Sequence, residues 1–163
     1  MSHRIKSQEL SALRFERIWV REAYFVDGAG EQQRPSQEDL EGIGINLEVR
    51  AEPAGSGDRA FVTVRAVLEP PAGKALFVKL SAAVEGEFSL QPGNDPERLR
   101  GFASLQAPVL LLPYVRQVIT DLTSQSRLGA LILPPINMAE VTKAMRGEPS
   151  PKGATAGTPA SPE

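Results

Sequence analysis

Few side chains in this 163-residue sequence have the types and spacing that covalent chemistry requires. The one histidine, His3, stands in a terminus that we expect to fray, which disfavours a histidine-based triad or metal site. The absence of cysteine excludes disulfides, thiolate metal ligands and a cysteine nucleophile. Glu85 and Glu87 could form a carboxylate pair, but two acids on one solvated sheet face explain that spacing more simply. We therefore expect no enzyme activity, no metal and no cofactor.

The apolar residues point instead to binding. The stretch FERIWVREAYFV at 15–26 carries apolar side chains on both faces if it forms a strand. The run VLLL at 109–112 directly precedes an amphipathic pattern, and LILPPIN at 131–137 is an apolar connector stiffened by two prolines. Together these segments exceed what one sheet and two helices can cover. The sequence thus predicts self-association, a groove for apolar partners, or both.

Four segments have the composition and alternation of strands, and they would position these apolar residues. They are residues 15–26, 43–51, 59–69 and 75–90. Short Gly- and Pro-containing turns between the last three predict antiparallel neighbours. Simple alternation along the first strand places Trp19 and Phe25 on the same face. The polar stretch 27–42 is expected to be a long loop.

Two helices are expected after the strands. Pro113 can occupy a first helical turn, and an i, i+3, i+4, i+7 pattern of apolar residues follows, which predicts a helix over 113–126. Asn137 can cap a second helix that ends near residue 146, with Glu140 in a capping-box position. The fold class is therefore α+β, a four-stranded antiparallel sheet with two C-terminal helices packed on one side.

Composition and charge indicate the domain boundaries, the class of partner and the cellular location to expect. Residues 1–12 are expected to be a flexible segment, 13–146 one domain, and 147–163 a disordered tail rich in Pro, Gly and Ala. A formal net charge of -2 does not favour nucleic acid. Neither an 18-residue apolar run nor a secretory signal pattern is present, so we expect a cytoplasmic protein without direct membrane insertion.

Two stretches resemble the SecB family of bacterial protein-export chaperones. FERIWVREAYF at 15–25 is similar to the family's opening strand, and LLPYVRQVITDLTSQSRLGALILPPINM at 111–138 matches its Pro-Tyr-x-Arg helix start and its Leu-x-Pro-Pro-Ile-Asn connector. The resemblance implies a homotetramer, assembled as a dimer of dimers, that holds unfolded preproteins without ATP and delivers them to the SecA motor. It also implies that the connector is the wall of a client groove and that the last helix is its lid.

The resemblance assigns roles to individual residues. Expected client-binding residues are Trp19, Phe25, Leu128, Leu131, Leu133, Ile136, Met138, Val141 and Met145. Expected residues of the subunit interface are Leu80, Ala82, Val84, Val115, Val118, Ile119 and Leu122. Glu22 falls at an acidic position of the SecA-docking surface. Aspartate at both Leu133 and Ile136 is expected to abolish client holding and to leave the oligomer intact.

This chain also departs from the family pattern. Val26, Lys79 and Ser81 stand near positions where family members carry acids or an apolar contact, and the net charge is closer to zero than is usual there. These departures leave open whether SecA is a partner, and they allow an alternative function, that of a SecB-like chaperone of a toxin-antitoxin system. A third reading, of another class, is a protein that binds a small apolar ligand in an enclosed cavity.

Overall fold

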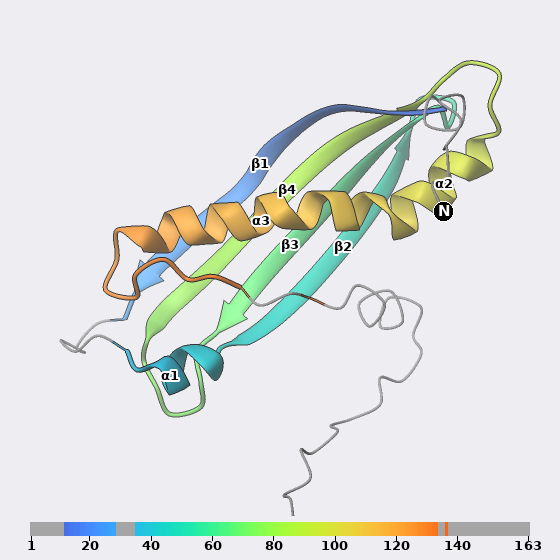
Figure 1. The fold of residues 1–163 in the computed structure, drawn as a ribbon. Helices are drawn as coiled ribbons and strands as arrows, with labels where there is room; N and C mark the ends of the chain where they lie inside the picture. Colours follow the sequence, from blue (N-terminus) through green and yellow to red (C-terminus); the bar gives the residue numbers. More distant parts are fainter. Residues whose placement is uncertain (1–11, 29–34, 134–135, 137–163) are drawn as a thin grey trace, which may run out of the picture.

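The computed structural model describes residues 12–28, 35–133 and 136 of the chain (Figure 1). Its elements are β1 (Leu13–Asp27), α1 (Gln37–Glu41), β2 (Gly44–Ala54), β3 (Arg59–Glu69), β4 (Phe77–Leu90), α2 (Pro96–Leu105) and α3 (Ala107–Ser124). The expected last helix, with Met138, Val141 and Met145, lies outside the described residues, as does the expected tail. Of the expected flexible segment 1–12 only Ala12 is described, and it is buried beside the sheet.

The four strands form one antiparallel sheet in the order β1-β4-β3-β2, which confirms the predicted sheet. The strands β2, β3 and β4 are joined in sequence by short turns, as the Gly and Pro signals indicated. β1 pairs with β4 instead of β2, so the segment between β1 and β2 connects the two edges of the sheet. β2 therefore has one edge that no described strand covers.

The helices α2 and α3 lie on one face of this sheet, and α3 crosses it obliquely (Figure 1). The core forms between them. Val62 and Val64 of β3 alternate inward, and they pack with Leu80 and Val84 of β4 against the inner side of α3. Gly86 permits this close approach, because a Cβ atom there would lie 2.8 Å from the Cδ2 atom of Leu111. The stripe of apolar residues on α3 is thus used inside one chain.

The helical region differs from the prediction in two respects. α3 begins at Ala107 instead of residue 113, so VLLL is helical and Pro113 lies inside the helix. α2 was not predicted, although its start has a regular signal. Asp95 caps α2 by accepting a hydrogen bond from the Glu97 backbone N–H at 3.0 Å, and Pro96 follows at the first helical position.

The expected loop before β2 also contains a short helix, α1. Ser36 caps it in a reciprocal arrangement: its hydroxyl accepts the Asp39 N–H, and the Asp39 carboxylate accepts the Ser36 N–H. Lys74, in the turn before β4, forms an ion pair with Asp39 at 3.2 Å. The cap stabilises α1, and the ion pair ties it to the turn between β3 and β4.

β1 does not alternate simply, because its register with β4 shifts between Phe15 and Arg17 and again between Val20 and Glu22. Each shift changes the face on which the following side chains lie. Trp19 stands opposite Glu85, on the face away from α3, whereas Phe25 stands opposite Leu80, on the helix-covered face. The prediction that Trp19 and Phe25 share a face is therefore wrong.

Candidate apolar groove

A cleft of about 510 Å³ lies between α1, the beginning of β2 and the residues that follow α3. From here on, the connector means residues 128–133, which end with the first three residues of the LILPPIN stretch. The cleft is lined mainly by apolar side chains, with two polar groups from α1; the lining residues are Gln37, Leu40, Glu41, Ile43, Ile45, Ala130, Leu131, Ile132 and Leu133. Such a surface can bind apolar side chains through burial, but its few polar groups provide little directional recognition.

The connector alternates between the core and the surface. Leu131 and Leu133 are 7% and 2% exposed and belong to the core, whereas Ile132 between them is 75% exposed. An extended segment places successive side chains on opposite sides, which explains the pattern. Ile132 is therefore the side chain that the connector offers to a ligand.

Three side chains of α3 fasten the connector backbone. The Thr123 hydroxyl accepts a hydrogen bond from the Leu131 N–H at 2.9 Å, and the Thr120 hydroxyl donates one to the Leu131 carbonyl at 3.0 Å. The Arg116 guanidinium donates to the Leu133 carbonyl at 2.7 Å. These bonds satisfy backbone groups of an irregular segment that is partly buried. They also order the groove wall before any ligand arrives.

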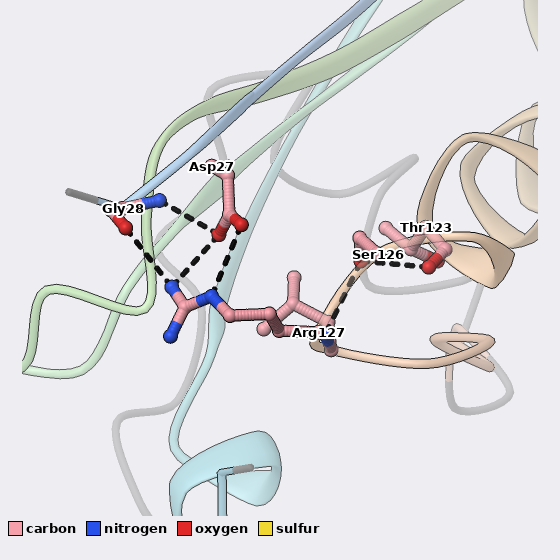
Figure 2. Close-up of polar contacts among 6 residues, drawn as sticks. Asp27, Gly28, Thr123, Ser126 and Arg127 are labelled. Atoms are coloured by element: carbon pink, nitrogen blue, oxygen red, sulfur yellow. Dashed lines mark hydrogen bonds and ion pairs between the residues drawn. The ribbon is translucent and has the colours of Figure 1, made fainter. Parts of the chain in front are cut away.

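The turn from α3 into the connector is tied to the end of β1 (Figure 2). Arg127 donates two hydrogen bonds to the Asp27 carboxylate, at 3.0 and 2.8 Å, and a third to the Gly28 carbonyl at 3.0 Å. The hydrogen bonds from Arg127 lower the pKa of Asp27 below its ordinary value of 3.8, and the Gly28 N–H adds to this. Gly129 has a φ angle of +69°, which a glycine adopts without strain, and this lets the chain reverse.

Among the described residues of the predicted client-binding set, only some line the groove. Leu131 and Leu133 contribute to its lining, although most of each side chain is in the core. Leu128 is buried, and Ile136 is half-buried against the core. Trp19 and Phe25 do not line the cleft. Leu128, Leu131 and Leu133 therefore act chiefly as core residues that hold the connector.

Sequence reasoning missed seven of the nine lining residues, and four of the seven are large apolar residues. Ile132 is one, because the motif alone does not show which residues of LILPPIN face outward. Leu40 falls in a polar stretch that predicts a loop, although the capping-box spacing of Ser36 and Asp39 indicates the start of α1. Ile43 and Ile45 were recognised as an alternating strand, but nothing in their pattern indicated that the connector lies beside them.

The predicted subunit-interface residues lie largely inside a single chain. Leu80, Ala82, Val84, Val115 and Ile119 are each at most 1% exposed, so they cannot touch a second subunit unless the core opens. This corrects the expected interface. The amphipathic stripe was identified, but the chain's own sheet covers it. Val118 and Leu122 are half-buried.

A different set of apolar side chains faces outward on the helices. Large hydrophobic residues that are 39% to 47% exposed occur on the outer side of α2 and α3, namely Leu105, Val109, Leu110 and Tyr114. By length and composition alone, the helical stretch Pro96–Ser124 could also cross a membrane. The inner side of α3 packs on the sheet, where Leu111, Val115 and Ile119 are fully buried.

The sheet face away from α3, which we call the open face, carries acidic and basic side chains that pair with one another. Glu22 accepts hydrogen bonds from Ser81 and from Arg65, the latter at 3.2 Å, and Arg65 also reaches Glu48 at 3.3 Å. The Ser81 hydrogen bond lowers the pKa of Glu22, and Arg65 lowers it further. The Lys79 ammonium lies 4.6 Å from the centre of the Tyr24 ring. Glu22 is thus an ionised carboxylate whose negative charge is balanced by Arg65, on a surface where acidic and basic side chains pair.

The same face carries Trp19, which meets Phe61 edge to face at 6.2 Å and has the Arg17 guanidinium 5.2 Å from its ring centre. Glu87, 5% exposed, accepts from Arg17 at 2.5 Å and from Arg59 at 3.4 Å. Within the described residues no group of three or more acidic or histidine side chains is arranged to hold a metal ion.

Comparison with known proteins agrees with this geometry. The profile of the family described as "Preprotein translocase subunit SecB" matches residues 6–146. Similar chains include a protein-export protein SecB from Alcanivorax borkumensis, 25% identical over 92% of this chain and 96% of the relative, and one from Paramagnetospirillum magneticum, 28% identical over 87% and 90%.

The fold has a solved counterpart. The SecB-like chaperone of Mycobacterium tuberculosis, solved in complex with a ChAD peptide from the HigA1 antitoxin, superposes with a TM-score of 0.58 at 18% identity, over 80% of this chain and 95% of that one. The likeness in structure supports the sheet and helix arrangement described above. With a family match over nearly the whole chain, this protein belongs to the SecB family.

Proposed function

We propose that this protein is an ATP-independent holdase, which binds unfolded preproteins in the apolar groove and keeps them competent for export from the cytoplasm. One observation carries the proposal. The connector buries Leu131 and Leu133 but leaves Ile132 75% exposed beside the apolar side chains of α1 and β2. Ile132 and these neighbours line one continuous apolar surface, and such surfaces mark binding sites more often than a single exposed side chain does.

The energetics of such a groove suit temporary holding. Each client side chain that is fully buried contributes roughly 1.5 to 3 kcal/mol. Ordering a flexible chain offsets much of this gain, so a single groove binds weakly and releases readily. The wall itself needs little further ordering, because Arg116, Thr120 and Thr123 already fix it. No nucleotide is required in this cycle.

The edge of β2 with which no described strand pairs extends the surface available to a client. Ile45, Leu47 and Val49 are half-buried on the helix side and lead along the strand from the groove. At the far end lies a second pocket of about 240 Å³, lined by Ala51, Glu52, Pro53, Gly57, Arg59, Ala60, Leu99, Arg100, Ala103 and Ser104. Six residues of strand span about 20 Å, so an extended client of similar length could occupy both sites.

We further propose that several chains assemble, as a dimer of dimers. Support comes from the exposed apolar residues on the outer side of α2 and α3, among them Leu110 and Tyr114. A monomer seldom leaves such a row in water. Assembly would place several grooves on one particle, and binding at one groove would raise the effective concentration of the client at the next.

A toxin-antitoxin chaperone is the second candidate function. The charge balance of the open face favours it, because Glu22 is held by Arg65 and Ser81 and Lys79 lies nearby. SecA delivery through an acidic sheet would gain little from such a surface. A pull-down separates the two functions: the protein is immobilised, and SecA and a cognate antitoxin are passed over it. Retention of SecA supports export, and retention of the antitoxin alone supports the second candidate.

The holding activity is tested by diluting a denatured globular protein into an equimolar solution of this chain and recording light scattering. Ile132→Asp should abolish the suppression of aggregation. Val78→Asp is the matched control, because Val78 is 69% exposed on β4 and does not line the groove. A folded Ile132→Asp variant that holds clients as well as the native protein would refute the groove. A small-ligand protein would hold no client in any variant.

A further inference from the structure

We infer that three side chains on α3, Arg116, Thr120 and Thr123, set the register of the connector and so decide which side chain the groove presents. None of the three lines the groove. They are positioning residues, and the inference rests on the proposed function for the identity of the ligand. It assigns the selectivity of the groove to residues that the ligand does not touch.

The spacing of the three residues places them along one side of the helix, because positions four and seven apart lie on the same face. Thr123 and Thr120 engage the N–H and the carbonyl of Leu131, at 2.9 and 3.0 Å. Arg116 engages the carbonyl of Leu133 at 2.7 Å. In a sheet, a neighbouring strand would supply contacts at this two-residue interval. Here helical side chains take its place.

Because these contacts recur at an interval of two residues, they favour one register of the connector over a register shifted by one residue. A slip of one residue would turn Ile132 toward the core and move Leu131 and Leu133 to outward positions. The leucines would then lose their burial, which is 93% and 98% of their surfaces in the present register. The slip would also remove the N–H that the fully buried Thr123 hydroxyl accepts.

Thr123 has the strictest requirement of the three. Its hydroxyl accepts from Leu131 and at the same time donates to the Ile119 carbonyl at 2.9 Å. Valine has nearly the same shape but would leave the buried Leu131 N–H without an acceptor. Burying an unpaired donor costs free energy, so the connector backbone should shift to a position where the N–H is paired. Serine retains the hydroxyl, so Thr123→Ser should restore the register.

The absence of cysteine from the chain makes the register directly measurable. Ile132→Cys and Leu133→Cys are prepared as separate single-cysteine proteins, and their reaction with a maleimide is timed. In the native background the thiol at 132 should react at least about tenfold faster, since a buried thiol reacts only after an opening that costs free energy. Adding Thr123→Val should reduce this ratio about tenfold, and Thr123→Ser should leave it unchanged.

A ratio that stays the same in both Thr123→Val and Thr120→Val backgrounds would overturn the inference. Thr120→Val is included because Thr120 is only half-buried, so that variant tests the same row if Thr123→Val does not fold. Affinity for a reduced, alkylated polypeptide is measured in parallel and should fall with the ratio and recover in Thr123→Ser. If the ratio responds but even the native chain binds no polypeptide, the register assignment stands and the proposed function fails.

Discussion

The Thr123 hydroxyl lies 2.9 Å from the Leu131 nitrogen and 2.9 Å from the Ile119 carbonyl oxygen, so one fully buried group joins the connector to α3. This relationship explains how a segment without regular structure forms a groove wall. The backbone polar groups of Leu131 are satisfied by helical side chains, and the leucine side chain fills the core. The outward residue, Ile132, is left free for a ligand.

The closeness of α3 to the sheet predicts the effect of enlarging Gly86. Valine favours strands, a preference that spans about 1 kcal/mol, but a Cβ atom there would meet Leu111 at 2.8 Å and Phe88 at 3.0 Å. Overpacking of this kind costs typically 1 to 3 kcal/mol and should dominate. Gly86→Val should therefore lower the free energy of unfolding, measured by urea denaturation.

Gly101, in α2, is the matched control for this substitution. A Cβ atom at Gly101 meets no atom within 4 Å, and the residue is exposed within a helix. Gly101→Ala should therefore raise the free energy of unfolding by about 0.5 to 1 kcal/mol. A Gly86→Val protein as stable as the native one would show that α3 sits farther from β4 than the structure places it.

The ion pair between Asp27 and Arg127 predicts a pH-dependent stability. The Arg127 hydrogen bonds keep the pKa of Asp27 below 3.8 in the folded state, so the unfolded chain binds the proton more tightly. The contribution of the pair is therefore fully present above pH 3.8 and is lost as the pH falls through the lower, folded-state value. Unfolding free energies of the native protein and Asp27→Asn, measured from pH 6 downward, should converge in acid. Curves that stay parallel would contradict the role of this pair.

The sheet was predictable from the sequence because its turns and its alternation are local signals. The predicted strand over 59–69 coincides with β3, and the others differ from the observed bounds by a few residues. The face of Trp19 was not predictable, since the two register shifts in β1 depend on pairing with β4, which is distant in sequence. Period-two counting fails once a strand contains a bulge.

The helical region shows a second limit. The stripe containing Val115 and Ile119 was identified correctly as apolar, but periodicity does not reveal which surface covers it. The chain's own sheet covers it here, and the expected subunit contacts became core. A proline at position 113 predicts a first-turn residue, because proline usually begins or ends a helix, whereas Pro113 lies exposed inside α3 between the buried Leu112 and Val115.

The outer side of α2 and α3 predicts the effect of charge on assembly. Leu110 is 47% exposed beside Val109 and Tyr114, and a carboxylate there would have to be desolvated if a second chain covered this side. Leu110→Glu should reduce the native mass to that of a smaller assembly. Gln125→Glu adds the same charge beyond the apolar row, after the end of α3, and should leave the mass unchanged. Equal masses for Leu110→Glu and the native protein would place the subunit contact elsewhere.

Trp19 provides an intrinsic test that separates the two surfaces of the protein. It is the sole tryptophan in the chain, and it lies on the open face with Phe61 and Arg17, whereas the groove lies on the other side of the sheet and draws no residue from β1. Binding of an unfolded client in the groove should therefore leave the tryptophan emission maximum unchanged, and binding of a partner to the open face should shift it to the blue, because water is excluded from the indole. Titrations with a tryptophan-free unfolded polypeptide and with a tryptophan-free fragment of the partner measure this. A shift with the polypeptide that persists in Ile132→Asp would show that clients bind the open face.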